Sequence, residues 1–74
     1  MAPEPAACPE KESLLEDLRL VNRELNQIHT REIAAVQGGD MAGFEALQPE
    51  LEQARDWRRA VVDNLKRHLI EHGC

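Results

Sequence analysis

The sequence predicts an all-α protein, an antiparallel helical hairpin. Apolar residues recur every three or four positions over two long stretches, the spacing that gathers them on one face of a helix. One short segment, Gln37-Gly38-Gly39-Asp40, separates the two stretches. Adjacent glycines end a helix by taking left-handed backbone angles, and an aspartate caps the helix that follows. The chain is therefore expected to turn back on itself at this segment.

Residues 1–9 contain three prolines and no helical periodicity, which predicts a disordered N-terminal tail. Residues 10–74 are expected to form one domain, with a helix over about 10–37, a turn at 38–40 and a helix over about 41–72. The start of the first helix has two alternatives. Pro9 needs no N–H partner at a first helical position, whereas Ser13 opens the capping box Ser13-Leu14-Leu15-Glu16.

The first helix carries an apolar stripe with one exception, Glu32, which falls where an apolar residue is due. Steps of three and four residues connect the members of this stripe. They are Leu14, Leu18, Val21, Leu25, Ile28 and Ala35, and the face is widened on one side by Leu15, His29, Ile33 and Val36.

The second helix continues the same spacing but contains Pro49. A proline in a helix interior removes a backbone donor and clashes with the preceding turn, so the helix is expected to be kinked or broken there. Because Phe44 and Leu47 stay in phase with Leu51, a kinked continuous helix is favoured over two separate helices. The apolar residues of this stretch are Phe44, Leu47, Leu51, Ala54, Val61, Val62, Leu65 and Leu69.

Two such helices joined by a short turn lie antiparallel, with residue numbers across the contact summing to roughly 79. A lone hairpin has one contact surface and no third layer, while the apolar arc of the second helix exceeds the roughly 100° that faces one core. We therefore expect a homodimer that forms a four-helix bundle. The candidate interface residues are Trp57, Val61, Ala46, Ile33, Arg58 and Glu32.

Three of these interface residues have alternative roles. Trp57 either anchors a dimer or an unidentified protein partner, or simply covers the contact between the two helices. Glu32 and Arg58 lie on opposite apolar stripes at heights that do not match within one hairpin, so they are candidates for a pair between two chains. The alternative is that both side chains reach water at the edge of the stripe.

Four residues with metal-binding or redox chemistry gather at the open end of the predicted hairpin: Cys8, His68, His72 and Cys74. Two histidines four residues apart and two thiolates make a donor set suited to zinc. The two cysteines alone could instead form a disulfide clasp, which a reducing cytoplasm would not preserve. Two free terminal thiols are favoured over both alternatives, so no cofactor is expected.

Charge and motifs exclude several function classes. The net charge is -5 with basic and acidic residues interleaved, which argues against nucleic-acid binding. No apolar run approaches the length of a membrane span, and the N-terminus lacks signal-peptide features, so a cytoplasmic protein is expected. His29 and Glu32 lie one turn apart without a nucleophile, so catalysis is not expected. The predicted function is a non-enzymatic, self-associating interaction or regulatory module; the alternative is a metal- or redox-responsive protein.

Overall fold

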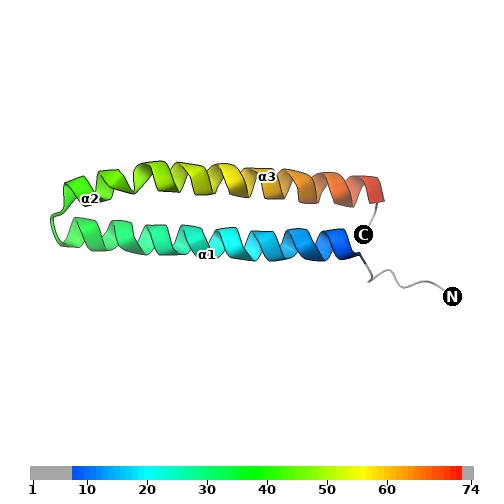
Figure 1. The fold of residues 1–74 in the computed structure, drawn as a ribbon, viewed down its shortest axis with the longest axis horizontal. Helices are drawn as coiled ribbons and strands as arrows, with labels where there is room; N and C mark the ends of the chain where they lie inside the picture. The colour runs from blue at the N-terminus through cyan, green and yellow to red at the C-terminus, as the bar shows by residue number, and fades with distance from the viewer. Residues whose placement is uncertain (1–7, 73–74) are drawn as a thin grey trace.

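The computed structural model describes residues 8–72, with the side chain of His72 excepted. Within this range every regular element is a helix: α1 (Pro9–Gln37), α2 (Met41–Ala46) and α3 (Gln48–His72). Helix α1 runs antiparallel to α2 and α3, which follow one another in a bent line (Figure 1). The predicted helical hairpin with an interrupted second half is therefore confirmed. The prediction of a disordered tail falls mostly on residues 1–7, which lie outside the described residues.

Helix α1 begins at Pro9, so the first of the two predicted starts is correct. Proline has no N–H to satisfy in the first turn, and Cys8 precedes it as an N-cap without a side-chain hydrogen bond. The Cys8 carbonyl accepts a 3.0 Å bond from the Glu12 N–H. Glu10 and Glu12 also place negative charge near the positive end of the helix dipole, which favours this start.

The turn at residues 38–40 forms as predicted. Gly39 has φ +73, a left-handed conformation that a glycine adopts without a side-chain clash. The Asp40 N–H donates to the Ala35 carbonyl at 2.8 Å, which closes the end of α1. The Asp40 side chain then accepts a 2.8 Å bond from the Gly43 N–H and caps α2.

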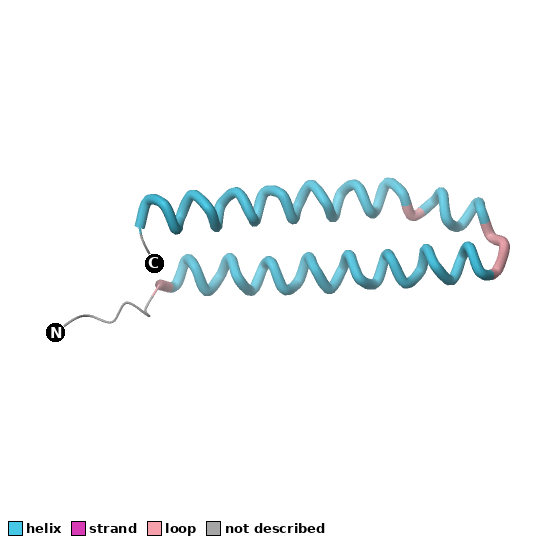
Figure 2. Tube along the Cα trace, turned by 180° about the vertical axis from the view of Figure 1, so that it is seen from behind, coloured by secondary structure: helices cyan, strands magenta, loops and turns pink. Residues whose placement is uncertain are grey.

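The second half of the hairpin is interrupted at Leu47, two residues before Pro49 (Figure 2). The Leu47 N–H donates to the Phe44 carbonyl, three residues back, as in a tightened last turn. Pro49 has no N–H to give to the carbonyl four residues earlier, so helical bonding cannot pass unbroken through this point. The second half is thus bent, as the prediction of a helix kinked or broken at Pro49 expected, and its helical bonding is interrupted at Leu47.

The core lies between α1 and the α2–α3 line, along a contact that we call the seam. Val21 and Ile28 have no exposed surface. The apolar phase predicted across Pro49 is kept, because one cluster contains Ile28, Leu47, Leu51 and Ala54, with Leu25 packed against it. Polar pairs across the seam, such as Arg58 with Asn22 and Gln48 with Glu32, have residue numbers that sum to roughly 79, as predicted.

Among the described side chains, seven large apolar ones keep much of their surface exposed. They are Leu20, Ile33, Val36, Met41, Trp57, Leu69 and Ile70. Over the part of the chain that the structure describes, no helix has the length and apolarity needed to cross a bilayer.

Candidate functional site

The open end of the hairpin contains a contact between a cysteine and a histidine that are 60 residues apart in the chain. Cys8 Sγ lies 2.8 Å from His68 Nε2. Both side chains are buried, and His68 is the only buried polar residue found among the described side chains. The other ring nitrogen of His68, Nδ1, lies 3.3 Å from Glu10 Oε1. The first turn of α1 and the last turns of α3 thus bring together a sulfur, an imidazole and a carboxylate.

The hydrogen-bonding capacity of these groups fixes the role of each nitrogen. An ionised carboxylate only accepts, so the Nδ1 that faces Glu10 carries a proton whenever that carboxylate is ionised. A disulfide sulfur has no proton, so Nε2 can hydrogen-bond to Cys8 Sγ only as a donor. Glu10 is largely exposed and His68 is buried, so the carboxylate stays in contact with water while the ring is held in place. The carboxylate therefore orients the imidazole toward the sulfur.

Cys8 is disulfide-bonded. The chain has one other cysteine, Cys74, which lies outside the described residues. The expectation of two free thiols is therefore wrong for Cys8, and the clasp is the alternative that agrees with its state. Whether two cysteines stay free depends on the redox potential of their surroundings, which the chain itself does not determine.

The zinc alternative named Cys8, His68, His72 and Cys74. The structure brings Cys8 and His68 together, whereas the His72 side chain and Cys74 lie outside the described residues. Among the side chains that the structure does describe, no group of three histidine, cysteine or acidic residues has metal-binding geometry. A disulfide sulfur is also not a thiolate, the form of cysteine that binds zinc. In its disulfide form, Cys8 thus does not fit the proposed zinc site.

A groove of about 370 Å³ lies beside this cluster. His68 and Glu10 form part of its wall, and the remaining wall is polar apart from one leucine. The other lining residues are Ser13, Leu14, Asn64, Arg67 and Glu71. The groove opens to solvent and is wide enough for a small polar molecule to approach the imidazole.

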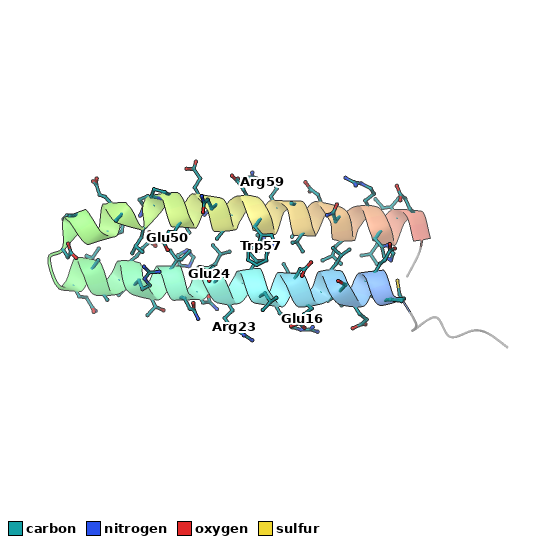
Figure 3. The ribbon with its side chains drawn as sticks, in the orientation of Figure 1. Glu16, Arg23, Glu24, Glu50, Trp57 and Arg59 are labelled. Atoms are coloured by element: carbon teal, nitrogen blue, oxygen red, sulfur yellow. The ribbon has the colours of Figure 1, made fainter. Side chains whose placement is uncertain are left out.

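The candidate interface residues lie on different sides of the seam. Trp57 lies between the two helices in Figure 3, beside Glu24 and Glu50, and these residues border one small depression. We call this the Trp57 side. Trp57 itself is 42 % exposed, so the hairpin already covers more than half of this residue. The alternative in which Trp57 covers the seam therefore describes its position in the hairpin.

The opposite side of the seam carries Arg58, whose Nε donates a 3.1 Å bond to Asn22 Oδ1. We call this the Arg58 side. Ile33 lies eleven residues beyond Asn22 and Leu69 eleven beyond Arg58, a spacing that returns to the same helix face. Ile33 and Leu69 are 60 % and 45 % exposed. The Arg58 side therefore presents an exposed apolar side chain near each end of the hairpin, Ile33 near the turn and Leu69 near the open end.

Glu32 and Arg58 both have partners within the hairpin. Gln48 Nε2 donates a 2.7 Å bond to Glu32 Oε2, and Arg58 binds Asn22 as described above. Neither charge therefore needs a partner from a second chain, which was the reason for pairing them across an interface. Val61 is buried in the seam and Ala46 is exposed at the end of α2, so these two residues do not share one surface.

Sequence reasoning missed Glu10, Asn22 and Gln48 as partners of His68, Arg58 and Glu32. The pairing sum of roughly 79 contained the signal, because each of these residues falls within one or two positions of the level it predicts. In comparisons with known proteins, no family model, curated protein or solved structure matches this chain.

Proposed function

We propose that this protein is a non-enzymatic interaction module in which two copies of the hairpin pack into a four-helix bundle. The observation that supports this proposal is the apolar surface on the Arg58 side, where Ile33 and Leu69 remain exposed beside a seam that is only two helices wide. Burial of such surface from water is the main favourable term in association. A second copy supplies an equivalent surface under two-fold symmetry, so no other partner chemistry is needed.

The choice of the Arg58 side over the Trp57 side follows from how much apolar surface each presents. On the Trp57 side, Leu20 and the half-covered Trp57 lie among Glu24, Glu50 and Gln53. On the Arg58 side, Val36 lies beside Ile33 near the turn, and the half-buried Val62 lies beside Leu69 near the open end. Apolar side chains near both ends of one side of the hairpin give a second hairpin two places at which to pack.

Sedimentation equilibrium of the full chain tests this proposal. The expected species has twice the chain mass of 8.4 kDa and dissociates on dilution. A folded species that keeps the single-chain mass at every concentration would contradict it. Trp57, the only tryptophan in the chain, gives a fluorescence control: on the Trp57 side, away from the proposed interface, its emission should change little on dilution.

The alternative function, a protein that responds to metal or redox conditions, is favoured at the open end by one observation. Cys8 is disulfide-bonded and lies 2.8 Å from a buried imidazole nitrogen. A disulfide that closes a loop longer than about 60 residues is nominally worth about 4 kcal/mol, a large part of the stability of a domain this small. Reduction should therefore lower the melting temperature reversibly, and an unchanged melting temperature would contradict a redox response. Stoichiometric zinc in reduced protein would support the metal variant, and its absence would contradict it.

A further inference from the structure

We infer that the proposed dimer contains a binding site for a small multivalent oxyanion of the phosphate class, formed where the cationic middles of two Arg58 sides meet. The inference deepens the self-association proposed above and rests on it. It adds a ligand class and a means of regulation, because an anion held between the two copies favours the dimer over the separate hairpins.

The first support is a groove of about 330 Å³ along α3 on the Arg58 side. Among the described residues that line it, four are cationic, one is acidic and one is apolar. Basic and acidic residues are interleaved along the sequence of α3, yet the helix gathers several basic ones on this face. The groove therefore carries positive charge in a chain whose net charge is -5. Its lining consists of Arg55, Arg58, Arg59, Lys66, Asp63 and the half-buried Val62.

Nearby carboxylates leave this positive charge largely in place. On α1, Glu24 borders the depression on the Trp57 side, and Asp17, seven residues earlier, lies on the same helix face. On α3, Arg59 pairs with Asp56 at 2.9 Å, but the two side chains are 70 % and 66 % exposed. An ion pair in water contributes little, so the Arg59 guanidinium can turn toward an anion at small cost.

The second support is the height of the groove along the hairpin. Ile33 lies eleven residues from Asn22 toward the turn. Leu69 lies eleven residues from Arg58 toward the open end. Because Arg58 donates to Asn22 across the seam, this bond lies midway between the two exposed apolar side chains. The groove, which contains Arg58, thus occupies the middle of the Arg58 side.

Two-fold symmetry brings this middle against its own copy. An axis across the hairpin that places the Ile33 end of one copy at the Leu69 end of the other passes at the height of Arg58. An axis along the hairpin pairs every height with the same height of the second copy. In both arrangements the apolar ends pack while the two cationic middles approach each other.

The third support is the chemistry of the meeting charges. Like charges that face one another across an interface oppose association. A multivalent anion between them replaces this repulsion by attraction, and guanidinium groups bind phosphate oxygens through paired hydrogen bonds. None of the described residues that line the groove is aromatic, so a nucleobase has no side chain there on which to stack. The recognised group is therefore the phosphate chain itself.

The test compares the dissociation constant of the full chain in tripolyphosphate and in sodium chloride of equal ionic strength, by sedimentation equilibrium at neutral pH. We expect tripolyphosphate to tighten self-association about tenfold, because binding of the anion and of the second copy are linked. Isothermal titration calorimetry should find one anion for two chains. Adenosine triphosphate at the same concentration should have no larger effect than tripolyphosphate.

The double variant Arg55→Gln/Lys66→Gln removes two exposed cations of the groove and keeps the bond between Arg58 and Asn22. It should reduce the effect of tripolyphosphate to less than about twofold. Without the anion it should associate more tightly than its control, because less like charge faces the second copy.

Arg23→Gln/Arg67→Gln is the matched control, since it changes the net charge equally at two other exposed cations. Arg23 borders a depression formed by α1 alone, and Arg67 lines the groove beside His68. This control should respond to tripolyphosphate as the wild type does.

Four outcomes overturn the inference. A dimer with the same dissociation constant in both solutions would show that no anion is linked to association, and would leave the proposed dimer intact. Equal tightening of the wild type and of Arg55→Gln/Lys66→Gln would place the anion elsewhere. Weaker self-association in tripolyphosphate would mean that the anion and the second copy compete for the Arg58 side. A larger effect of adenosine triphosphate would contradict recognition of the phosphate chain alone. The single-chain mass in every solution would instead contradict the dimer itself, so the two failures give different results.

Discussion

Gln48 donates a 2.7 Å hydrogen bond to Glu32 across the seam, from the start of α3 to the last turns of α1. The same amide also contacts the Phe44 carbonyl at 3.2 Å, next to the break before Pro49. One side chain thus satisfies both the acidic residue in the apolar stripe and a carbonyl at the end of α2. The two irregular features of the sequence, Glu32 and Pro49, meet at this residue.

Gln48→Ala should lower the free energy of unfolding by about 1 to 2 kcal/mol, because it leaves the half-buried Glu32 carboxylate without its donor. Urea denaturation followed by circular dichroism measures the change. Gln53→Ala is the control, because Gln53 is exposed on the same helix and should change the stability by less than about 0.5 kcal/mol. Equal effects of the two substitutions would show that the Gln48–Glu32 bond contributes nothing to stability.

Ile28→Ala should destabilise the hairpin by about 2 to 5 kcal/mol, because Ile28 is fully buried and its truncation leaves a cavity in the seam. Ile33→Ala, five residues along the same helix, removes the same atoms from a side chain that is 60 % exposed. In the dissociated hairpin at high dilution it should cost less than about 1 kcal/mol. Thermal unfolding of both variants makes the comparison, and a larger effect at Ile33 would contradict the described core.

The two turn glycines should respond to alanine with opposite signs. Gly39→Ala places a side chain at φ +73 and should cost about 1 to 2 kcal/mol. Gly38 has φ -87, and a Cβ there meets only backbone oxygens at 3.4 Å or more. Gly38→Ala should therefore be neutral or slightly stabilising, because it restricts the unfolded chain without strain. Urea midpoints that move in the same direction for both variants would contradict the assigned turn.

Substitutions at Asp40 and Gly43 should have non-additive effects on the free energy of unfolding. A Cβ at residue 43 overlaps the Asp40 carboxylate, so Gly43→Ala displaces the cap and loses about 1 kcal/mol of capping. In the Asp40→Ala background the same change meets no carboxylate and should stabilise α2 by up to about 1 kcal/mol, since alanine favours a helix over glycine. A double-mutant cycle measures this reversal, and additive effects would contradict it.

Leu69→Ser and Leu20→Ser form a matched pair for the proposed dimer, because the two leucines are 45 % and 41 % exposed on opposite sides of the seam. Leu69→Ser should weaken self-association about tenfold or more, since each of two copies loses part of a leucine burial. Leu20→Ser should leave the dissociation constant within about twofold. If both substitutions weakened self-association equally, the assignment of the dimer interface to the Arg58 side would be contradicted.

Much of the fold was predictable because it depends on local signals. The apolar spacing predicted the helix face that contains the buried Val21 and Ile28. The glycines and Asp40 predicted the turn, where Gly39 has a positive φ and Asp40 caps the next helix. The break at Leu47 could not be located from the apolar spacing, because that spacing continues unchanged across the position where the backbone hydrogen bond is missing. The start at Pro9 could not be separated from Ser13, because both carry valid local start signals.

The candidate site was predictable only in part. Antiparallel pairing placed Cys8 near His68, but which atoms meet depends on side-chain rotamers that spacing does not determine. Glu10 and Asn22 are polar residues at the seam edge, where many partners are within reach of a long side chain. The disulfide state of Cys8 depends on its surroundings, which composition does not report.

The distance along the chain between contacting residues grows steadily from one end of this hairpin to the other. Asp40 and Gly43 are separated by three positions, whereas Cys8 and His68 are separated by 60. Closing a short loop loses less chain entropy than closing a long one, so the reduced hairpin, without its disulfide, should form from Gly39 outward and fray in the reverse order. The contact between Cys8 and His68 is then the last to form, and in the reduced chain the chemical reactivity of Cys8 reports whether the two helices are paired along their whole length.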